Sequence, residues 1–171
     1  DINVEEAKNF IIDKYKNYNI ENITFIDYLD ICLQDKDLDL VIITTPTKYH
    51  YFGVKSSLES GKHVLCEKPL SHSKTEIEEL YYIAEQSNLK LLCAYNRRFD
   101  PQIETIKTKV KNNEVGKLCC INTISRDYPY PSPDYIKQSS GIFHDCAVHD
   151  IDFVNWITDE LPKSVYVVGN K

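Results

Sequence analysis

The sequence contains no methionine, one tryptophan and five glycines among its 171 residues. No apolar run approaches the roughly 20 residues of a membrane-spanning helix, and the N-terminus lacks the basic and apolar segments of a secretory signal. We therefore expect no membrane partner. Because no initiator methionine is present and residue 1 is Asp, we expect the chain to be either processed or a fragment.

Positive charge and paired cysteines are also scarce. Lys and Arg number 20 against 26 acidic residues, and the net charge of −6 argues against a nucleic-acid partner. None of the six cysteines has C-x-x-C spacing, so a zinc site or a thioredoxin-like motif has no support. Several lie in apolar runs, where a free thiol packs as a small hydrophobe. These features favour a reducing, cytoplasmic location.

The first 96 residues alternate short apolar strands with single helices. A composition of 42% hydrophobic and 27% charged residues is typical of a globular protein. We predict strands at 23–26, 40–45, 63–66 and 90–95, and helices at 4–18, 27–34, 49–60 and from Ser73 onward. This alternation predicts right-handed βαβ units and a parallel sheet. Residues 1–96 therefore have the pattern of most of a doubly wound α/β domain.

The pattern changes after residue 96, where a polar joint leads into a second region. There we predict helices from about 101 to 113 and at 141–156, strands at 118–124 and 164–168, and a stiff proline-rich loop at 127–133. Ser73 with Glu76 forms a capping box for the helix before this region. We expect residues 97–171 to belong to a second domain.

Lys68 is the first candidate for chemistry. It follows the predicted strand at 63–66, and Pro69 biases it towards an extended backbone. Ligands bind at the carboxyl edge of open α/β sheets, where a partly desolvated lysine can polarise an oxygen or exchange a proton. The alternative is a solvated lysine at a strand end.

Asp145 and His149 form the second candidate. At i and i+4 of a predicted helix they share one face, and a carboxylate there can stabilise a protonated imidazole for acid–base catalysis. Because Asp150 and Asp152 follow, a divalent-metal site is a second interpretation. A charged surface helix is the third, and spacing alone leaves all three open.

Two further positions are ambiguous. His50 follows the loop after the 40–45 strand, where it either caps the next helix or contacts a ligand. Asp1 precedes the first helix, where an acidic residue of a dinucleotide fold binds the adenosine ribose. The alternative is a helix N-cap, which Asp1 or Asn3 could provide.

Four motifs then occur in one order along the whole chain. They are Thr44-Thr45-Pro46 with His50, Cys66-Glu67-Lys68-Pro69-Leu70, Asn96-Arg97-Arg98-Phe99-Asp100-Pro101, and Gly141-Ile142-Phe143-His144-Asp145 with His149-Asp150-Ile151-Asp152. Together they resemble the Gfo/Idh/MocA family of NAD(P)-dependent oxidoreductases. The third motif and the stretch 132–137 are most similar to the inositol dehydrogenases of that family.

The resemblance implies a fold and an extent. It implies a Rossmann domain over 1–96 lacking its first strand and glycine-rich turn, then over 97–171 the start of an α+β domain with an open, mainly antiparallel sheet. The chain would thus be a fragment without the first βαβ unit and the C-terminal half of the second domain. Without a G-x-G-x-x-G turn, we expect tight dinucleotide binding to fail and the chain alone to be inactive. The parent protein is expected to be a homo-oligomer, a tetramer or dimer.

The resemblance also implies residue roles. Catalysis is expected from Lys68, Asp145 and His149. Substrate binding is expected from these three together with Arg97. The residues expected to bind the cofactor are Asp1, Thr45, Pro46, His50, Glu67 and Lys68, and no metal is expected. NAD is favoured over NADP, because the carboxylate of Asp1 would repel a 2′-phosphate.

The implied reaction moves a hydride from a secondary alcohol of a polyol or sugar, with myo-inositol as the first choice, to NAD. The alternative is a non-catalytic or truncated relative that binds a sugar or nucleotide or acts as a regulatory protein. A non-catalytic relative is expected to have lost Lys68, Asp145 or His149, and all three are present.

Overall fold

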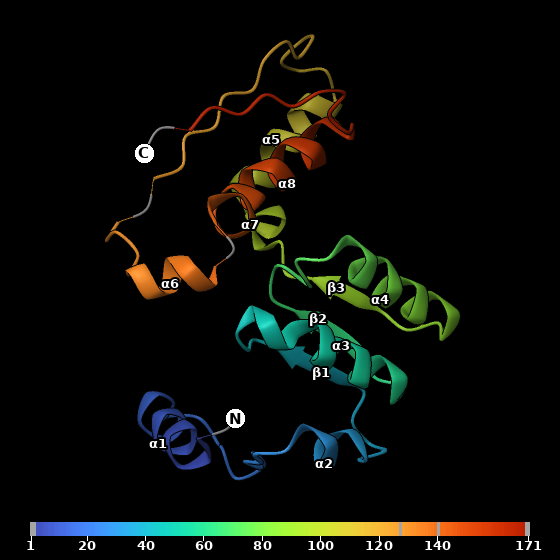
Figure 1. Cartoon of the computed structure of the whole chain (residues 1–171), viewed down its shortest axis with the longest axis vertical. Helices are drawn as coiled ribbons and strands as arrows, with labels where there is room; N and C mark the ends of the chain where they lie inside the picture. Colours follow the sequence, from blue (N-terminus) through green and yellow to red (C-terminus); the bar gives the residue numbers. More distant parts are fainter. Residues whose placement is uncertain (1–2, 127, 140, 170–171) are drawn as a thin grey trace. The chain divides into compact units, whose positions relative to one another are not determined.

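A computed structural model describes residues 3–126, 128–139 and 141–169 of the chain. The chain divides into two compact units, Asp1–Leu92 and Cys93–Lys171, and Figure 1 shows the elements of each. Asp1, expected to contact the cofactor, lies outside the described residues. Among the described residues, none of the helices is long and apolar enough to cross a membrane.

The first unit is built on a three-stranded sheet. Its strands are β1 (Leu40–Ile43), β2 (His63–Cys66) and β3 (Leu91–Cys93), in the order β1-β2-β3. β1 and β2 run parallel with Ile43 opposite Cys66, and the Glu67 amide extends the ladder by donating to the Ile43 carbonyl at 2.9 Å. The parallel α/β prediction is therefore confirmed.

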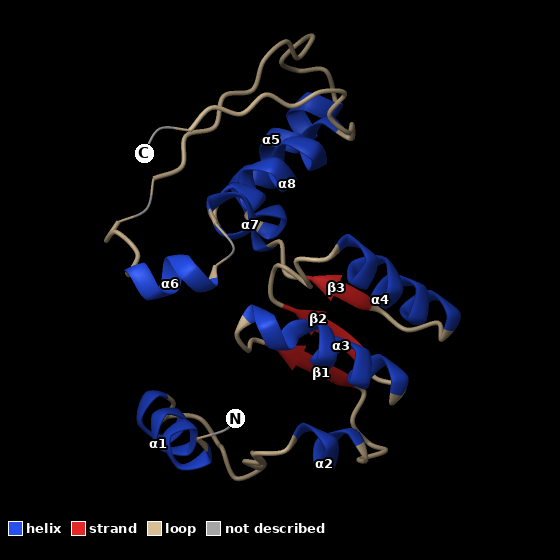
Figure 2. Ribbon diagram, viewed as in Figure 1, coloured by secondary structure: helices blue, strands red, loops and turns tan. Residues whose placement is uncertain are grey.

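Two helices follow the strands of this sheet and pack on each other (Figure 2). A 3-10 turn, η1 (Thr47–Tyr49), leads into α3 (His50–Glu59), which contacts β1 and β2, while α4 (Lys74–Gln86) packs against α3. A Cβ on Gly53 would lie 3.3 Å from the Ile43 side chain, so glycine permits the close approach of α3 to β1. The buried core of these elements comprises Ile43, Val54, Leu58, Val64, Cys66, Leu70, Leu80 and Ala84.

The C-terminal end of α3 and the N-terminal end of α4 lie where the sequence signals predict. Gly61, with φ of +77°, lies just past α3, in the left-handed conformation that glycine adopts without strain. Ser73 caps α4 by accepting from the Glu76 amide at 3.4 Å. The Glu76 carboxylate accepts from the Ser71 hydroxyl, so this cap extends two residues further back than the predicted box.

The N-terminal segment differs from its prediction. The N-cap of α1 (Val4–Lys14) is Asn3, whose side chain accepts from the Glu6 amide at 3.2 Å. The N-cap alternative therefore holds for Asn3. The strand predicted at 23–26 is wrong, since these residues have no strand structure. A β-branched run forms a strand only when a neighbour completes its hydrogen bonds. The next helix, α2 (Leu29–Leu33), has no side-chain cap, so the predicted Asp27 cap is also wrong.

The second unit consists mainly of helices. Its elements after β3 are η2 (Asn96–Phe99), α5 (Pro101–Lys111), α6 (Pro133–Gln138), α7 (Ile142–Asp145) and α8 (Ala147–Thr158). η2, α5 and α7 all contact α8. Asp100 caps α5 by accepting from the Gln102 amide at 2.8 Å, and Pro101 occupies the first helical position, where its missing N–H costs nothing.

Three predictions for this unit are corrected. The single helix predicted over 141–156 is two helices, because the backbone turns at Cys146 (φ −100°, ψ −57°) between α7 and α8. The strands predicted at 118–124 and 164–168 are not strands. Their apolar side chains are largely exposed, Ile124 to 74% and Val165 to 78%. An apolar run without a hydrogen-bonded neighbour has no ladder to join, so no antiparallel sheet forms among the described residues.

Candidate functional site

Lys68 lies where the sequence placed it, two residues after the last residue of β2. Its side chain is half-buried, whereas that of Glu67 is exposed, and the Lys68 amide donates to the Glu67 carboxylate at 3.2 Å. The residue therefore occupies the carboxyl end of a parallel strand, the edge of such sheets at which ligands bind.

His50 joins the two loops that follow β1 and β2. Only 1% of the residue is exposed, with Nδ1 2.7 Å from the Pro69 carbonyl oxygen and Nε2 2.6 Å from that of Thr45. Both ring nitrogens therefore lie within hydrogen-bond distance of carbonyl oxygens, which only accept. The helix-cap interpretation is wrong, because the ring bonds carbonyls from the two loops rather than amides of α3. Instead it holds the loop carrying Lys68 against the loop carrying Thr45.

A cleft of about 710 Å³ opens beside the carboxyl end of β1. Among the residues expected to bind cofactor, Thr45 and Pro46 line it, whereas His50, Glu67 and Lys68 do not. Apolar and aromatic walls with a few hydroxyl groups suit a flat, polar-edged ligand. The residues that supply these walls and hydroxyl groups include Tyr28, Thr44, Tyr49 and Phe52.

A second pocket, of about 400 Å³, lies wholly within the second unit. Three of the predicted site residues line it together: Arg97 from η2, Asp145 from the end of α7 and His149 from α8. Its remaining lining residues are Ser125, Tyr128, Pro129, Pro131, Tyr135 and Cys146. The pocket thus combines an imidazole, a carboxylate and a guanidinium with an aromatic wall.

Tyr135 is a pocket residue that the sequence analysis missed. Its hydroxyl donates to Asp145 Oδ2 at 2.8 Å, and a donor of this kind fixes the orientation of the carboxylate. Ser132 caps α6 by accepting from the Tyr135 amide at 3.2 Å. The Ser132-Pro133 pair is a helix-start signal inside a region expected to be loop, and it could have located Tyr135.

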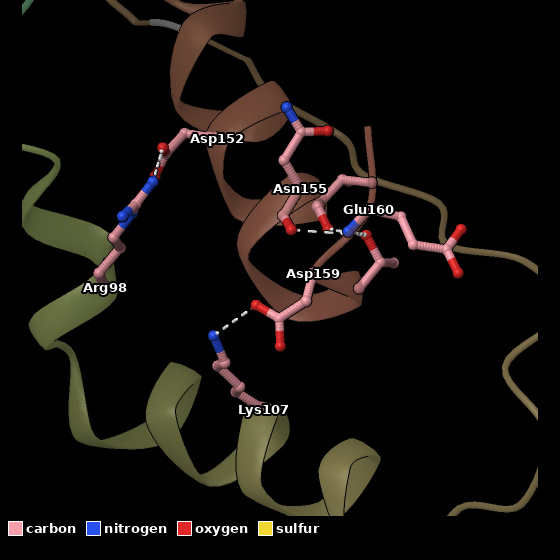
Figure 3. A network of polar contacts seen from close by, with 8 residues as sticks. Arg98, Lys107, Asp152, Asn155, Asp159 and Glu160 are labelled. Atoms are coloured by element: carbon pink, nitrogen blue, oxygen red, sulfur yellow. Dashed lines mark hydrogen bonds and ion pairs between the residues drawn. The ribbon is translucent and has the colours of Figure 1, made fainter. Parts of the chain in front are cut away.

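Two ion pairs connect η2 to α8. Arg97 Nη1 donates to Asp150 Oδ1 at 2.9 Å, and the Ser125 hydroxyl bonds the other oxygen of Asp150. Arg98 makes a two-pronged contact with Asp152, with Nε to Oδ2 at 2.9 Å and Nη2 to Oδ1 at 2.5 Å (Figure 3). These pairings occupy the acids on which the metal interpretation depended. Across the residues described, no cluster of three His, Cys, Asp or Glu residues could hold a metal ion.

Family comparisons cover both units. Residues 1–95 match a family model described as an oxidoreductase family with an NAD-binding Rossmann fold, and residues 103–171 match the model of a GFO/IDH/MocA C-terminal domain. The fold and the matched models place the chain in a family described as oxidoreductases with an NAD-binding Rossmann fold. The chain belongs to the Gfo/Idh/MocA family.

Curated relatives agree with this assignment. The chain is 38% identical over 153 residues to the uncharacterized oxidoreductase YrbE of Bacillus subtilis, covering 90% of this chain and 44% of the relative. It is 33% identical to the inositol 2-dehydrogenase of Rhizobium meliloti (75% and 39% covered) and 33% identical to the myo-inositol 2-dehydrogenase of Thermotoga maritima (81% and 41%). The chain therefore spans less than half the length of these relatives.

A solved structure gives the same picture. The scyllo-inositol dehydrogenase of Lactobacillus casei, with bound NAD(H) and scyllo-inositol, is 32% identical with a TM-score of 0.69. The match covers 76% of this chain and 40% of that one.

Proposed function

We propose that this protein oxidises a secondary alcohol of a ring polyol, myo-inositol first among them, with NAD as the hydride acceptor. The observation that carries the proposal is the second-unit pocket, in which Arg97, Asp145 and His149 line one cavity. Relatives named inositol 2-dehydrogenase support the choice of substrate.

The residues of the pocket divide the work of substrate activation. His149 accepts the proton of the reacting hydroxyl at an imidazole nitrogen, and Asp145 stabilises the imidazolium that results. Tyr135 orients Asp145 through its hydrogen bond of 2.8 Å. Arg97 donates to a second hydroxyl group and fixes the ring. When bound, NAD supplies the chemistry of hydride acceptance from the carbinol carbon.

Residues of the first unit fit the remaining roles. We assign Lys68 to stabilising negative charge on the substrate oxygen, since an ammonium favours a developing alkoxide. Thr45 and Pro46 in the first-unit cleft would contact the cofactor. His50 would support both by holding their loops together. All six cysteines are free thiols in the structure, which is compatible with the predicted cytoplasmic location.

The proposal is tested by following NADH fluorescence while the full-length protein is incubated with NAD and a panel of myo-inositol, scyllo-inositol, glucose and linear polyols. We expect turnover of a ring polyol, reduced about a thousandfold in His149→Asn, as expected for loss of an acid–base group. His144→Asn is the matched control, since His144 is an exposed histidine of α7 outside the pocket lining. Absence of turnover with every polyol, together with absence of polyol binding, would remove the substrate assignment.

A separate titration addresses the cofactor. The sequence contains no G-x-G-x-x-G turn, so we expect this 171-residue chain to bind NAD weakly. Micromolar affinity in a fluorescence titration would contradict that expectation and would leave the polyol assignment untouched.

A further inference from the structure

Arg97 is the only cationic side chain among the described residues that line the second-unit pocket. A guanidinium in a substrate pocket ordinarily attracts carboxylates and phosphates, because it presents paired N–H donors to them. The pocket would then favour sugar acids or polyol phosphates over uncharged polyols. Its preference therefore depends on whether the charge of Arg97 is already compensated by the protein.

Asp150 provides that compensation. Its Oδ1 accepts from Arg97 Nη1 at 2.9 Å, and its Oδ2 accepts from the Ser125 hydroxyl. The Asp150 side chain is 17% exposed and that of Arg97 is 41% exposed, so the carboxylate is the more buried partner. Partial burial makes the pair less sensitive to screening than a surface ion pair.

Asp145 adds a second negative charge at the wall of the same pocket. An anionic ligand beside Arg97 would be repelled by the Asp145 carboxylate in the pocket wall and by the Asp150 carboxylate paired with Arg97, whereas an uncharged polyol can accept from Arg97 and donate to Asp145. The electrostatic balance thus disfavours anions and leaves the hydrogen-bonding capacity of the pocket intact.

We propose that Asp150 determines substrate specificity: by pairing with Arg97, it makes this pocket select uncharged polyols and reject anionic ones. This inference rests on the proposed function, because it concerns the same pocket. Asp150 acts through Arg97 and is not assigned a contact with the reacting atoms.

The chain offers a matched control. Arg98 and Asp152 form an ion pair between the same two elements, η2 and α8, and neither residue lines the pocket. Asp152→Asn removes the same charge from the same helix without changing what faces the ligand. Asp150→Asn keeps the shape of the side chain, and its amide group can still form hydrogen bonds. The substitution removes the charge that neutralises Arg97.

The experiment measures the affinities of the full chain for myo-inositol and myo-inositol monophosphate by calorimetry. We expect wild type and Asp152→Asn to prefer myo-inositol. In Asp150→Asn, the ratio of the two affinities should shift towards the phosphate by about tenfold, as expected for one uncompensated charge in a half-exposed site. Raising the ionic strength should reverse that shift, because it screens the exposed guanidinium.

Circular dichroism and Trp156 emission show whether Asp150→Asn folds. If Asp150→Asn does not fold, two other variants replace it. Asp150→Glu retains the charge and should keep the wild-type ratio of affinities, and Arg97→Gln should leave the preference for myo-inositol in place. An unchanged ratio in Asp150→Asn, an equal shift in Asp152→Asn, or wild-type preference for the phosphate would overturn the inference. Binding of neither ligand by wild type would instead remove the proposed function, and the specificity inference with it.

Discussion

In the first unit, α3 packs on the sheet and α4 packs on α3 through fully buried side chains, whereas in the second unit η2 and α8 are joined by two arginine–aspartate pairs. Val54, Leu58, Val64 and Leu80 are each no more than 1% exposed. In the second unit, Ile157 is the buried apolar residue of α8, and two acids of that helix, Asp150 and Asp152, pair with the arginines of η2.

This difference separates two ways of fixing a functional side chain. A hydrophobic core holds the strands and helices from which the Lys68 loop leaves by non-directional packing, which tolerates salt and pH but responds strongly to lost volume. Ion pairs hold Arg97 and α8 in a directional arrangement that is weaker and depends on charge. Mutations in the two units should therefore differ in the size and in the salt dependence of their effects.

The largest effect is expected in the core of the first unit. Leu80 is fully buried on α4, and Leu80→Ala should lower the free energy of unfolding by about 3 kcal/mol, from lost burial and the cavity left behind. Urea denaturation followed by circular dichroism measures this. Tyr82→Ala on the same helix, at a position that is 63% exposed, should change it by less than about 0.5 kcal/mol. Equal effects of the two substitutions would contradict the assignment of the core.

His50→Ala should have the next largest effect, about 2 kcal/mol, because it leaves a cavity and two loop carbonyls without their partner. It should also loosen the loops that carry Thr45 and Lys68. Amide hydrogen exchange should then be faster in the segments that directly follow β1 and β2. The matched substitution is His63→Ala, since His63 is only half-buried and its side chain accepts from the Lys90 amide at 3.0 Å. If His63→Ala destabilised the loops equally, the special role of His50 would be lost.

In the second unit, Asp152→Asn should cost about 1 kcal/mol, since this two-pronged pair is half-buried. The loss should shrink as salt concentration rises, unlike that of Leu80→Ala. Asp159→Asn serves as the control, because Asp159 is 72% exposed in its pair with Lys107 (Figure 3), and asparagine tolerates the positive φ at that position. A salt-independent loss in Asp152→Asn would contradict the ion-pair account.

Tyr135→Phe addresses the orientation of Asp145 within the proposed reaction. Removing the hydroxyl should lower kcat/KM for the polyol about fivefold, or about 1 kcal/mol, by leaving the carboxylate less well fixed. Tyr128→Phe, at a pocket position that is 97% exposed, should have little effect. Steady-state kinetics on the two variants decides between orientation and general aromatic packing.

The sequence predicted the first unit better than the second for the same physical reason. Strands β1 and β2 and helices α3 and α4 carry local signals, such as the Ser73 cap and the Gly61 turn, that agree with their tertiary environment. Packing in the second unit depends on pairings between distant residues. Nothing in the spacing of Arg97 and Arg98 indicates that they meet Asp150 and Asp152.

The pocket shows the same limit. The i and i+4 spacing of Asp145 and His149 predicted a shared face, and the structure places both at one pocket although α7 and α8 are separate helices. Tyr135 could not be assigned from periodicity, because α6 lies in a region dominated by prolines and tyrosines. Its contact with Asp145 depends on how the intervening residues turn, which single-sequence patterns do not encode.

The smallest expected effect comes from a polar contact on the surface of the first unit, where Glu79 of α4 bonds Lys55 at 2.5 Å and Tyr51 at 2.7 Å on α3. The hydrogen bonds from Lys55 and then Tyr51 lower the pKa of Glu79 below its ordinary value of 4.5. Its carboxylate therefore contributes stability above that ordinary value, and the contribution is lost as pH falls through the lowered pKa.

The basic limb has the opposite sign. The bond to Glu79 raises the pKa of Lys55 above 10.5 and that of Tyr51 above 10.0, so their contributions are complete at neutral pH and are lost as pH rises through the raised values. The difference in unfolding midpoint between wild type and Glu79→Gln should thus be widest between the lowered pKa of Glu79 and the raised pKa values of Lys55 and Tyr51. This difference should narrow in acid. Glu78→Gln, which breaks an exposed pair with Lys74, should show a smaller difference. A Glu79→Gln difference that stays constant into strong acid would show that packing, rather than charge, joins α3 to α4 at this point.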